Sequence, residues 1–335
     1  MSKSFQNNQI SQSCIVEWLK NMNDVEISLQ QEYDDVMSHA YPPLSFSTYS
    51  ELIKSKQTFL LLYTAIFAYL LSAWRTEISL FHFIWFTISL FFAITGSTLL
   101  NMYVDRDIDA LMERTKDRPL PSQRVPPSTV LKHGVLFTTT GTLAVGVFTN
   151  LVTMVIVFLG FFFDVMVYSL LLKRRTRLSI IFGGIAGGLP AIAGRTAILG
   201  YVDLAGVLMG AFVLCWIPLH ILTLALIPKN LEGYKNANVP MWPVVSSTTQ
   251  TIYVVTLSAI FSASAVVLTG IVLQINIFTL VPLILFCAYI LFQAFANLIE
   301  PSQKRTFRIF KLASIFMAFA FLWLFVGVII TSFLP

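Results

Sequence analysis

Long apolar stretches separated by short polar segments run through most of the chain. A helix that crosses the hydrocarbon core of a bilayer needs about 20 mainly apolar residues. Nine stretches meet this requirement, at about 57–76, 79–103, 130–148, 150–172, 178–199, 204–227, 250–272, 276–298 and 310–333. The pattern therefore predicts an all-α, polytopic membrane protein with about nine transmembrane helices.

The basic residues fall on alternate loops of this arrangement. With nine spans and a cytoplasmic N-terminus, the cytoplasmic segments are the N-terminal tail, 104–129, 173–177, 228–249 and 299–309. Together with the helix ends that flank them, these segments hold 20 of the 22 Lys and Arg residues, and only Arg75 and Arg195 lie elsewhere. Because cytoplasmic loops are enriched in Lys and Arg, we expect a cell-membrane protein whose N-terminus is cytoplasmic and whose C-terminus is outside.

Composition agrees with a membrane protein. Hydrophobic residues make up 56% of the 335 residues and charged residues 12%, against about 25% charged in a soluble domain. The formal net charge of +5 does not indicate a nucleic-acid partner, because the basic residues act as topology signals. The three cysteines, Cys14, Cys215 and Cys287, are scattered and form no CxxC motif, so neither a disulfide nor a zinc site is predicted.

Residues 1–50 differ from the rest of the chain. They are rich in acids and contain no Arg, unlike a mitochondrial transit peptide, and they have no early apolar core, unlike a signal peptide. We expect a loosely ordered cytoplasmic tail over 1–50 and a transmembrane domain over 51–335. A short amphipathic helix over 15–37 is the alternative for the tail.

The candidate chemistry begins at the end of the second apolar stretch. Asn101, Asp105 and Asp109 recur every four residues, so they share one face if the helix continues past Tyr103. Oxygen ligands of this kind suit Mg²⁺, which prefers one or two carboxylates together with phosphate oxygens and water. The alternative is a solvated loop whose acids balance nearby bases, and spacing alone leaves both readings open.

Basic residues follow on the same side of the predicted membrane. Arg114 and Arg118 come shortly after the acids, and Lys173 follows the fourth apolar stretch closest to its apolar boundary. Arg175 and Arg177 are interpreted as topology anchors. Acids next to these cations outline a diphosphate site with a bound metal ion.

Four blocks of sequence carry a resemblance to a known family. They are NMYVDRDIDALMERTKDRPL (101–120), YSLLLKRRT (168–176), IFGGIAGGLP (181–190), and Trp216, Pro218 and His220 together with VPMWP (239–243). The chain resembles the UbiA superfamily of intramembrane prenyltransferases and, within it, the protohaem IX farnesyltransferases, over about residues 50–330.

The resemblance implies a bundle of nine helices around a lipid-open cavity. Its reaction would join farnesyl diphosphate to a vinyl group of haem b, giving haem O for terminal-oxidase haem biosynthesis. Asn101, Asp105 and Asp109 would hold Mg²⁺ and act in catalysis with Tyr168 and Lys173. The diphosphate would be bound by three cationic side chains: Arg114, Arg118 and Lys173. Haem A synthase or the terminal-oxidase assembly are the implied protein partners, and haem b is a substrate rather than a cofactor.

Three residues are candidates for the haem pocket: Trp216, His220 and Arg195. A histidine inside a span is more often packed and hydrogen-bonded than catalytic, although polar groups within a membrane are functional candidates. For Arg195 the alternative is a side chain that extends to the outer membrane surface.

The chain also departs from the family pattern. Where the second acidic site of the family has an Asp, this sequence has Gly233, so Glu232 is the candidate for that metal-binding role. Asp164, inside the fourth span, has no counterpart that the resemblance supplies. We expect it either to pair with a Lys or Arg or to add a ligand to a second metal.

Two other functions are weighed against haem farnesylation. One is a UbiA-type enzyme that prenylates a quinone precursor or a lipid. The other is an ion-coupled transporter, which ranks lower because transporters usually place their charges near the membrane midplane, whereas here the acids gather at one end.

Overall fold

The structure is a computed structural model that describes residues 20, 22, 25–28, 45–74, 76 and 79–333. Within these residues every regular element is helical, and nine helices are long and apolar enough to cross a membrane. They are α3 (Ser55–Ala73), α4 (Leu80–Leu111), α5 (Pro127–Phe148), α6 (Leu151–Phe161) continued by η1 (Phe162–Leu172), α7 (Ser179–Leu199), α8 (Leu204–Ala225), α11 (Thr248–Val272), α12 (Ile277–Ile299) and α13 (Gln303–Phe333). The predicted all-α architecture and the nine predicted spans are confirmed.

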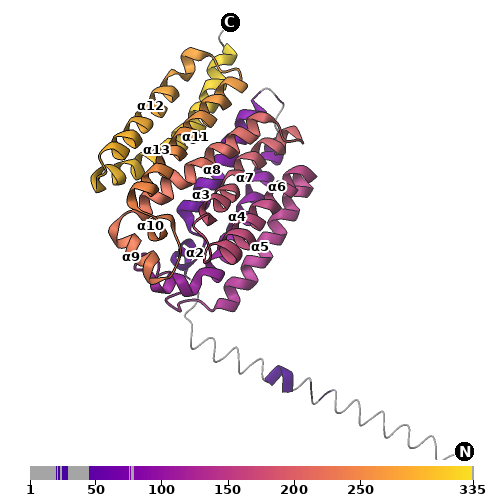
Figure 1. Ribbon diagram of the computed structural model, residues 1–335. Coiled ribbons are helices and arrows are strands. Elements are labelled where there is room, and N and C mark those ends of the chain that lie inside the picture. Colours follow the sequence, from indigo (N-terminus) through magenta and orange to yellow (C-terminus); the bar gives the residue numbers. More distant parts are fainter. Residues whose placement is uncertain are drawn as a thin grey trace, which may run out of the picture.

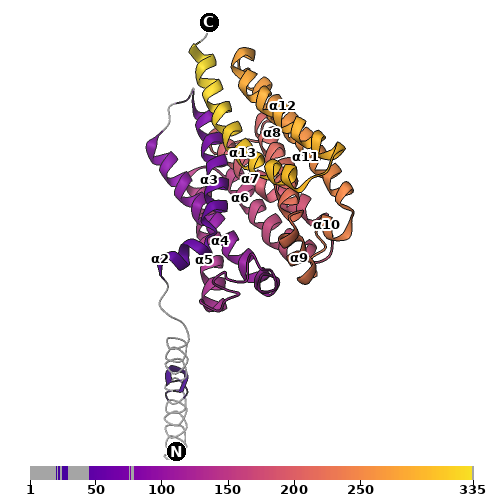
Figure 2. The same ribbon diagram turned by 90° about the vertical axis from the view of Figure 1, so that its left-hand side faces the viewer.

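Three short helices gather at one end of the bundle, which we call the polar end. They are α2 (Phe46–Leu52), α9 (Pro228–Asn236) and α10 (Trp242–Val245), and they lie at the bottom of Figure 1 while the C-terminus lies at the top. Figure 2 shows the same division from the side. The proposed boundary at residue 50 falls inside α2, and the predicted tail helix over 15–37 lies largely outside the described residues.

Two helices extend well beyond their predicted apolar stretches. The second stretch was predicted to end at 103, but α4 continues to Leu111, and α13 begins at Gln303 rather than at 310. No Gly or Pro lies between Asn101 and Leu111 to end α4. Hydropathy finds the part of a helix that lipid covers, so it misses polar turns that continue the same helix.

Close helix contacts hold α4 and α7 in place. Helix α4 packs along α5, and α7 packs between α3 and α8. A Cβ atom on Gly96 would overlap the backbone nitrogen of Thr138 in α5, and one on Gly188 would overlap the carbonyl oxygen of Gly210 in α8. Small residues permit this approach in membrane bundles, where tight packing drives helix association.

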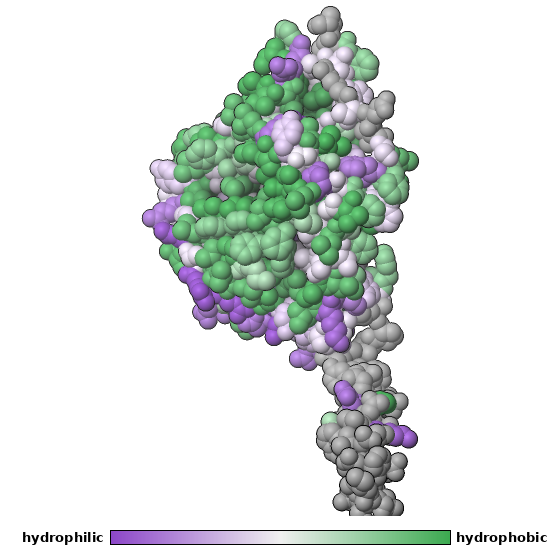
Figure 3. Space-filling view, turned by 90° about the vertical axis from the view of Figure 1, so that its right-hand side faces the viewer, coloured by the Kyte–Doolittle hydropathy of each residue, from purple (hydrophilic) through white to green (hydrophobic). Residues whose placement is uncertain are grey.

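The outer surface is broadly apolar. Figure 3 shows hydrophobic side chains over the middle of one face and hydrophilic ones gathered mainly toward the polar end. Large apolar side chains such as Leu80, Phe292 and Ile299 are exposed by 70%, 65% and 83%. A surface of this kind is suited to lipid rather than to water.

Candidate active site

The acidic motif occupies the last turns of α4 and faces inward. Asn101, Asp105 and Asp109 have exposed fractions of only 7%, 2% and 4%. The helix does continue through all three residues, as the shared face requires. Asp107 lies off this face, where it is exposed and binds Arg174 through two hydrogen bonds of 2.6 Å. The solvated-loop reading is therefore wrong for the three aligned residues, and Asp107, although exposed, also lies in the helix.

A cation binds each of the three inward-facing residues Asn101, Asp105 and Asp109, which we call the acidic face. The Lys173 ammonium lies 2.5 Å from Asp105 Oδ2, and Arg118 Nη1 lies 2.6 Å from Asp109 Oδ2. Burial alone would lower the pKa of Lys173, but neighbouring Tyr168 and Asp105 raise that pKa above its ordinary value. Lys173 is therefore held as a cation beside the acids.

The third cation, Lys54, is a site residue that sequence reasoning missed. Its ammonium group donates a 3.1 Å hydrogen bond to Asn101 Oδ1. Lys54 precedes α3 in a left-handed backbone conformation, with φ 43° and ψ 56°, which is uncommon outside glycine and often occurs at functional sites. Burial lowers the pKa of Lys54 to about 8, and the nearby positive charge of Arg118 adds to this effect. From the sequence alone, Lys54 is recognised only as one of the basic residues that indicate the membrane orientation.

The donor set of this face fits Mg²⁺. Asp105 Oδ1 is buried and has no hydrogen-bond partner among the described residues, so one carboxylate oxygen is left for a ligand. The described residues contain no cluster of three His, Cys, Asp or Glu side chains. Two carboxylates and an amide oxygen nevertheless suit Mg²⁺, because this ion usually completes its shell with water and substrate phosphates.

Tyr168 lies in a segment of π-helix, η1, and Lys173 caps the C-terminal end of that segment. The Tyr168 ring packs against Gly183 of α7, and the Lys173 ammonium lies 5.5 Å from the centre of that ring. The Lys173 amide donates to the Tyr168 carbonyl, five residues back, at 2.8 Å. The π-turn thus places the predicted tyrosine and lysine together beside Asp105.

Asp164 lies on the same segment but binds no base. Its carboxylate accepts hydrogen bonds from Ser97 at 2.9 Å and from the Asn101 amide at 3.3 Å. It forms no ion pair with any residue in the described part of the chain, so the expected Lys or Arg partner was wrong.

Two predicted ligands are not brought to the acidic face. Arg114 follows the end of α4 and is exposed, with no ion pair inside the described ranges. Glu232 is exposed on α9, while its neighbours Gly233 and Tyr234 turn inward and Gly233 lies against Met112. The position where the family carries its acid thus faces the bundle, and the acid of this chain is one residue away, on the outside.

The haem-pocket candidates separate into two groups. The His220 ring stacks between Trp216 and Phe310, with ring centres 4.7 and 4.6 Å apart, and its Nδ1 is buried without a partner in the described structure. Trp216 donates to the Ala313 carbonyl of α13 at 2.6 Å. Arg195 lies near the other end of α7, where it pairs with Asp203 at 2.6 Å, and so it does not reach the polar end.

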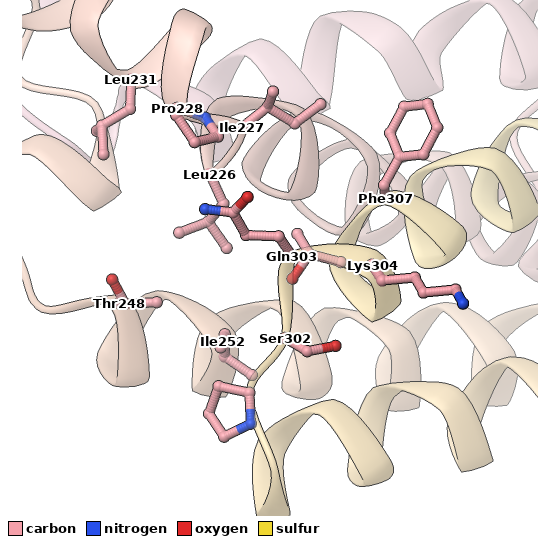
Figure 4. Close-up of a pocket in the computed structure, with 12 residues that line it drawn as sticks. Leu226, Ile227, Pro228, Leu231, Thr248, Ile252, Ser302, Gln303, Lys304 and Phe307 are labelled. Atoms are coloured by element: carbon pink, nitrogen blue, oxygen red, sulfur yellow. The ribbon is translucent and has the colours of Figure 1, made fainter.

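A separate hollow of about 570 Å³ is lined by residues of α9, α11 and α13 and of the connections that precede α9 and α13 (Figure 4). Leu226, Ile252 and Phe307 line it together with the polar Gln303 and Lys304, and no residue of the acidic face contributes. We assign no role in the reaction to this hollow.

Family comparison settles what kind of protein carries this site. The profile of the UbiA prenyltransferase family matches residues 61–325. The chain belongs to this family. It is therefore a multi-pass membrane prenyltransferase, as its nine apolar helices also indicate.

Named relatives are consistent with this family membership. The chain is 35% identical over 286 residues to a protoheme IX farnesyltransferase of Archaeoglobus fulgidus, covering 83% of this chain and 96% of the relative. It is 40% identical over 233 residues to the protein of that name from Korarchaeum cryptofilum, covering 69% and 74%.

Two solved structures share the fold. The first is described as digeranylgeranylglyceryl phosphate synthase in membranes, with a TM-score of 0.70, 21% identity and coverage of 84% of this chain and 98% of that one. The second is a UbiA homologue from Archaeoglobus fulgidus bound to GPP and Mg²⁺, with a TM-score of 0.60, 15% identity and coverage of 83% and 99%. At these identities the likeness establishes the fold alone.

Proposed function

We propose that this protein transfers the farnesyl group of farnesyl diphosphate to a vinyl group of haem b and so forms haem O. The named relatives support haem as the acceptor. The observation that carries the proposal is the unpartnered Oδ1 of Asp105 beside the ammonium of Lys173. This arrangement offers one metal-binding oxygen and a cation for diphosphate in the same place.

The acidic face and the cations around it have different roles in the proposed reaction. Asn101, Asp105 and Asp109 would hold Mg²⁺, which when bound neutralises the diphosphate and stabilises it as a leaving group. Lys54, Lys173 and Arg118 supply positive charge around the same volume and bind the phosphate oxygens directly. Positive groups fixed before the reaction stabilise the charge that develops in the transition state.

Bond cleavage requires protection from water. When the allylic C1–O bond breaks, the electron pair leaves with diphosphate and the farnesyl carbon becomes cationic. The vinyl group supplies the electrons of the new carbon–carbon bond. A water molecule then adds to the resulting haem cation and loses a proton to solvent, which gives the hydroxyethylfarnesyl group. The apolar bundle on the membrane side of Tyr168 keeps bulk water from the first cation.

We also propose that the polar end faces the cytoplasm in the cell membrane. The distribution of 20 of 22 basic residues supports this orientation. Substrate diphosphate would then enter from the cytoplasm, and the product would pass to haem A synthase or to terminal-oxidase assembly.

Purified full-length protein incubated with haem b, Mg²⁺ and either farnesyl or geranylgeranyl diphosphate tests the function. Mass spectrometry should detect the hydroxyethylfarnesyl haem, with diphosphate released only when Mg²⁺ is present. Unchanged haem together with prenylation of a quinone precursor or lipid would contradict the acceptor. Comparison of the two diphosphates determines the chain length.

A further inference from the structure

Asp164 contacts the site but has no part in the mechanism described above. It lies near the start of η1, two residues after Phe162. Five residues later, the Ser169 hydroxyl donates a 3.0 Å hydrogen bond to the Asp164 carbonyl oxygen. Segments of π-helix are rare and often mark functional sites. Here the π-turn places the Asp164 side chain and the Ser169 hydroxyl together against α4.

The Asp164 carboxylate contacts two successive turns of α4. Its Oδ2 accepts from Ser97 at 2.9 Å and its Oδ1 accepts from Asn101 Nδ2 at 3.3 Å. Ser97 and Asn101 are four residues apart and therefore lie on one face of the helix. Ser97 is only 8% exposed, so this contact is removed from solvent.

These contacts determine which way the Asn101 amide points. Its Nδ2 donates both to Asp164 and, at 2.8 Å, to Ser169 Oγ. Because the Ser169 hydroxyl gives its own proton to a carbonyl, it acts as the acceptor from Asn101. Both amide hydrogens are then used on the η1 side. The remaining atom, Oδ1, faces Lys54 at 3.1 Å.

We propose that Asp164 is a positioning residue that makes Asn101 present its oxygen, rather than its NH₂ group, to the metal and diphosphate. The proposal rests on the proposed function of the acidic face. An asparagine amide can turn by half a rotation, and the turned amide would direct two N–H donors at a cation. Partners that orient a metal ligand typically change metal affinity about 10–100-fold when they are removed.

Binding of Mn²⁺ in the presence of inorganic diphosphate tests this role without any turnover. Free Mn²⁺ is measured by electron paramagnetic resonance on the detergent-purified full chain, with thermal unfolding as the check on folding. Asp164→Ala should weaken Mn²⁺ binding about 10-fold or more. Asp107→Asn, on the outer side of the same helix, is the matched control and should bind as the wild type does.

An exchange of the Asn101 and Asp164 side chains distinguishes a positioning role from a general loss of structure. Asn101→Asp places a second carboxylate about where Asn101 met Asp164, so repulsion should weaken binding. The double variant Asn101→Asp/Asp164→Asn again pairs an amide with a carboxylate, because the new amide donates to the new acid. It should bind Mn²⁺ more tightly than Asn101→Asp alone, with strong favourable coupling between the two changes. The isosteric Asp164→Asn exchange also serves if Asp164→Ala does not fold.

Three results would overturn the positioning role. These are wild-type affinity in folded Asp164 variants, losses that simply add in the double variant, and a wild-type protein that binds no Mn²⁺. Failure of the proposed function gives a different result, since wild-type protein would then bind Mn²⁺ with diphosphate but leave haem b unchanged.

Discussion

The two ends of the bundle each contain buried charge, but among the described residues only the polar end has a buried carboxylate oxygen without a partner. At the far end of α7, Arg195 binds both carboxylate oxygens of Asp203 at 2.6 Å and also donates to Ser72. Asp203 in turn caps α8 through the amide of Gly206. At the polar end, Asp105 binds Lys173 through one oxygen and leaves the other without a partner.

This difference distinguishes a structural ion pair from the proposed binding site. The Arg195–Asp203 pair satisfies its own groups and gains nothing from a ligand. An unpartnered buried carboxylate oxygen destabilises the folded protein, because a lost hydrogen bond to a charged group costs about 1.5–3 kcal/mol. A bound ligand that contacts this oxygen would remove the cost. Four variants test this contrast.

Asp105→Asn should have the largest effect. It removes the charge that faces Lys173 and weakens the oxygen proposed to bind the metal, so haem farnesylation should fall by about 10²–10³-fold. The measurement is the rate of product formation by mass spectrometry, with Asp107→Asn as the control on the exposed side of α4. Full activity in Asp105→Asn would contradict the proposed metal site.

Lys173→Met should lower both activity and stability. It leaves Asp105 as an uncompensated buried charge, which typically costs about 3–5 kcal/mol. The double variant Asp105→Asn/Lys173→Met should recover much of the lost stability, measured by thermal unfolding in detergent, while remaining inactive. If the double variant is no more stable than Lys173→Met, the two groups are not coupled as the structure indicates.

Lys54→Arg should change the pH dependence of diphosphate binding. Burial lowers the pKa of Lys54 to about 8, so this side chain loses its positive charge as the pH rises through that value. Affinity for inorganic diphosphate should therefore fall by roughly 10-fold between pH 7 and 9.5 in the wild type. The arginine variant should retain its affinity over this range, because guanidinium stays protonated. Equal pH profiles for the two proteins would exclude Lys54 from the site.

Asp203→Asn should have the smallest effect and should concern stability alone. Burial raises the pKa of Asp203, but hydrogen bonds from Arg195 and Gly206 outweigh burial and leave the pKa below its ordinary value. The stabilisation is therefore present above about pH 4 and is lost as the pH falls through the folded-state pKa. We expect a loss of about 1–2 kcal/mol at neutral pH, with the farnesylation rate per folded molecule unchanged. A drop in that rate would connect this pair to catalysis.

Much of the fold was predictable because lipid imposes one simple requirement on sequence. Each spanning segment must be long and apolar, and the nine predicted segments correspond to the nine long apolar helices within the described residues. The alignment of Asn101, Asp105 and Asp109 followed from helical periodicity. Helix ends were less accurate, since the polar turns of α4 beyond 103 carry no hydropathy signal.

The partners of the acidic face were only partly predictable. Lys173 and Arg118 lie in blocks that carry the family resemblance, whereas Lys54 reaches Asn101 across 47 positions of sequence. The contact depends on the packing of α3 against α4 and on a left-handed backbone turn, neither of which has a sequence period. The π-turns of η1 are equally invisible to a search for a 3.6-residue repeat, so the hydrogen bonds of Asp164 had to be observed.

The three cations of the acidic face come from distant parts of the chain, and this affects how strongly the polar end resists unfolding. Lys54 precedes α3, Arg118 lies in the loop after α4, and Lys173 follows η1. A diphosphate that touched all three would act as a removable cross-link among three segments that are otherwise joined by helix packing and by the contacts of these cations with α4. Substrate at 100 times its dissociation constant should then add about 2.7 kcal/mol to the resistance of this end against unfolding. Loss of product would release that cross-link once in each cycle.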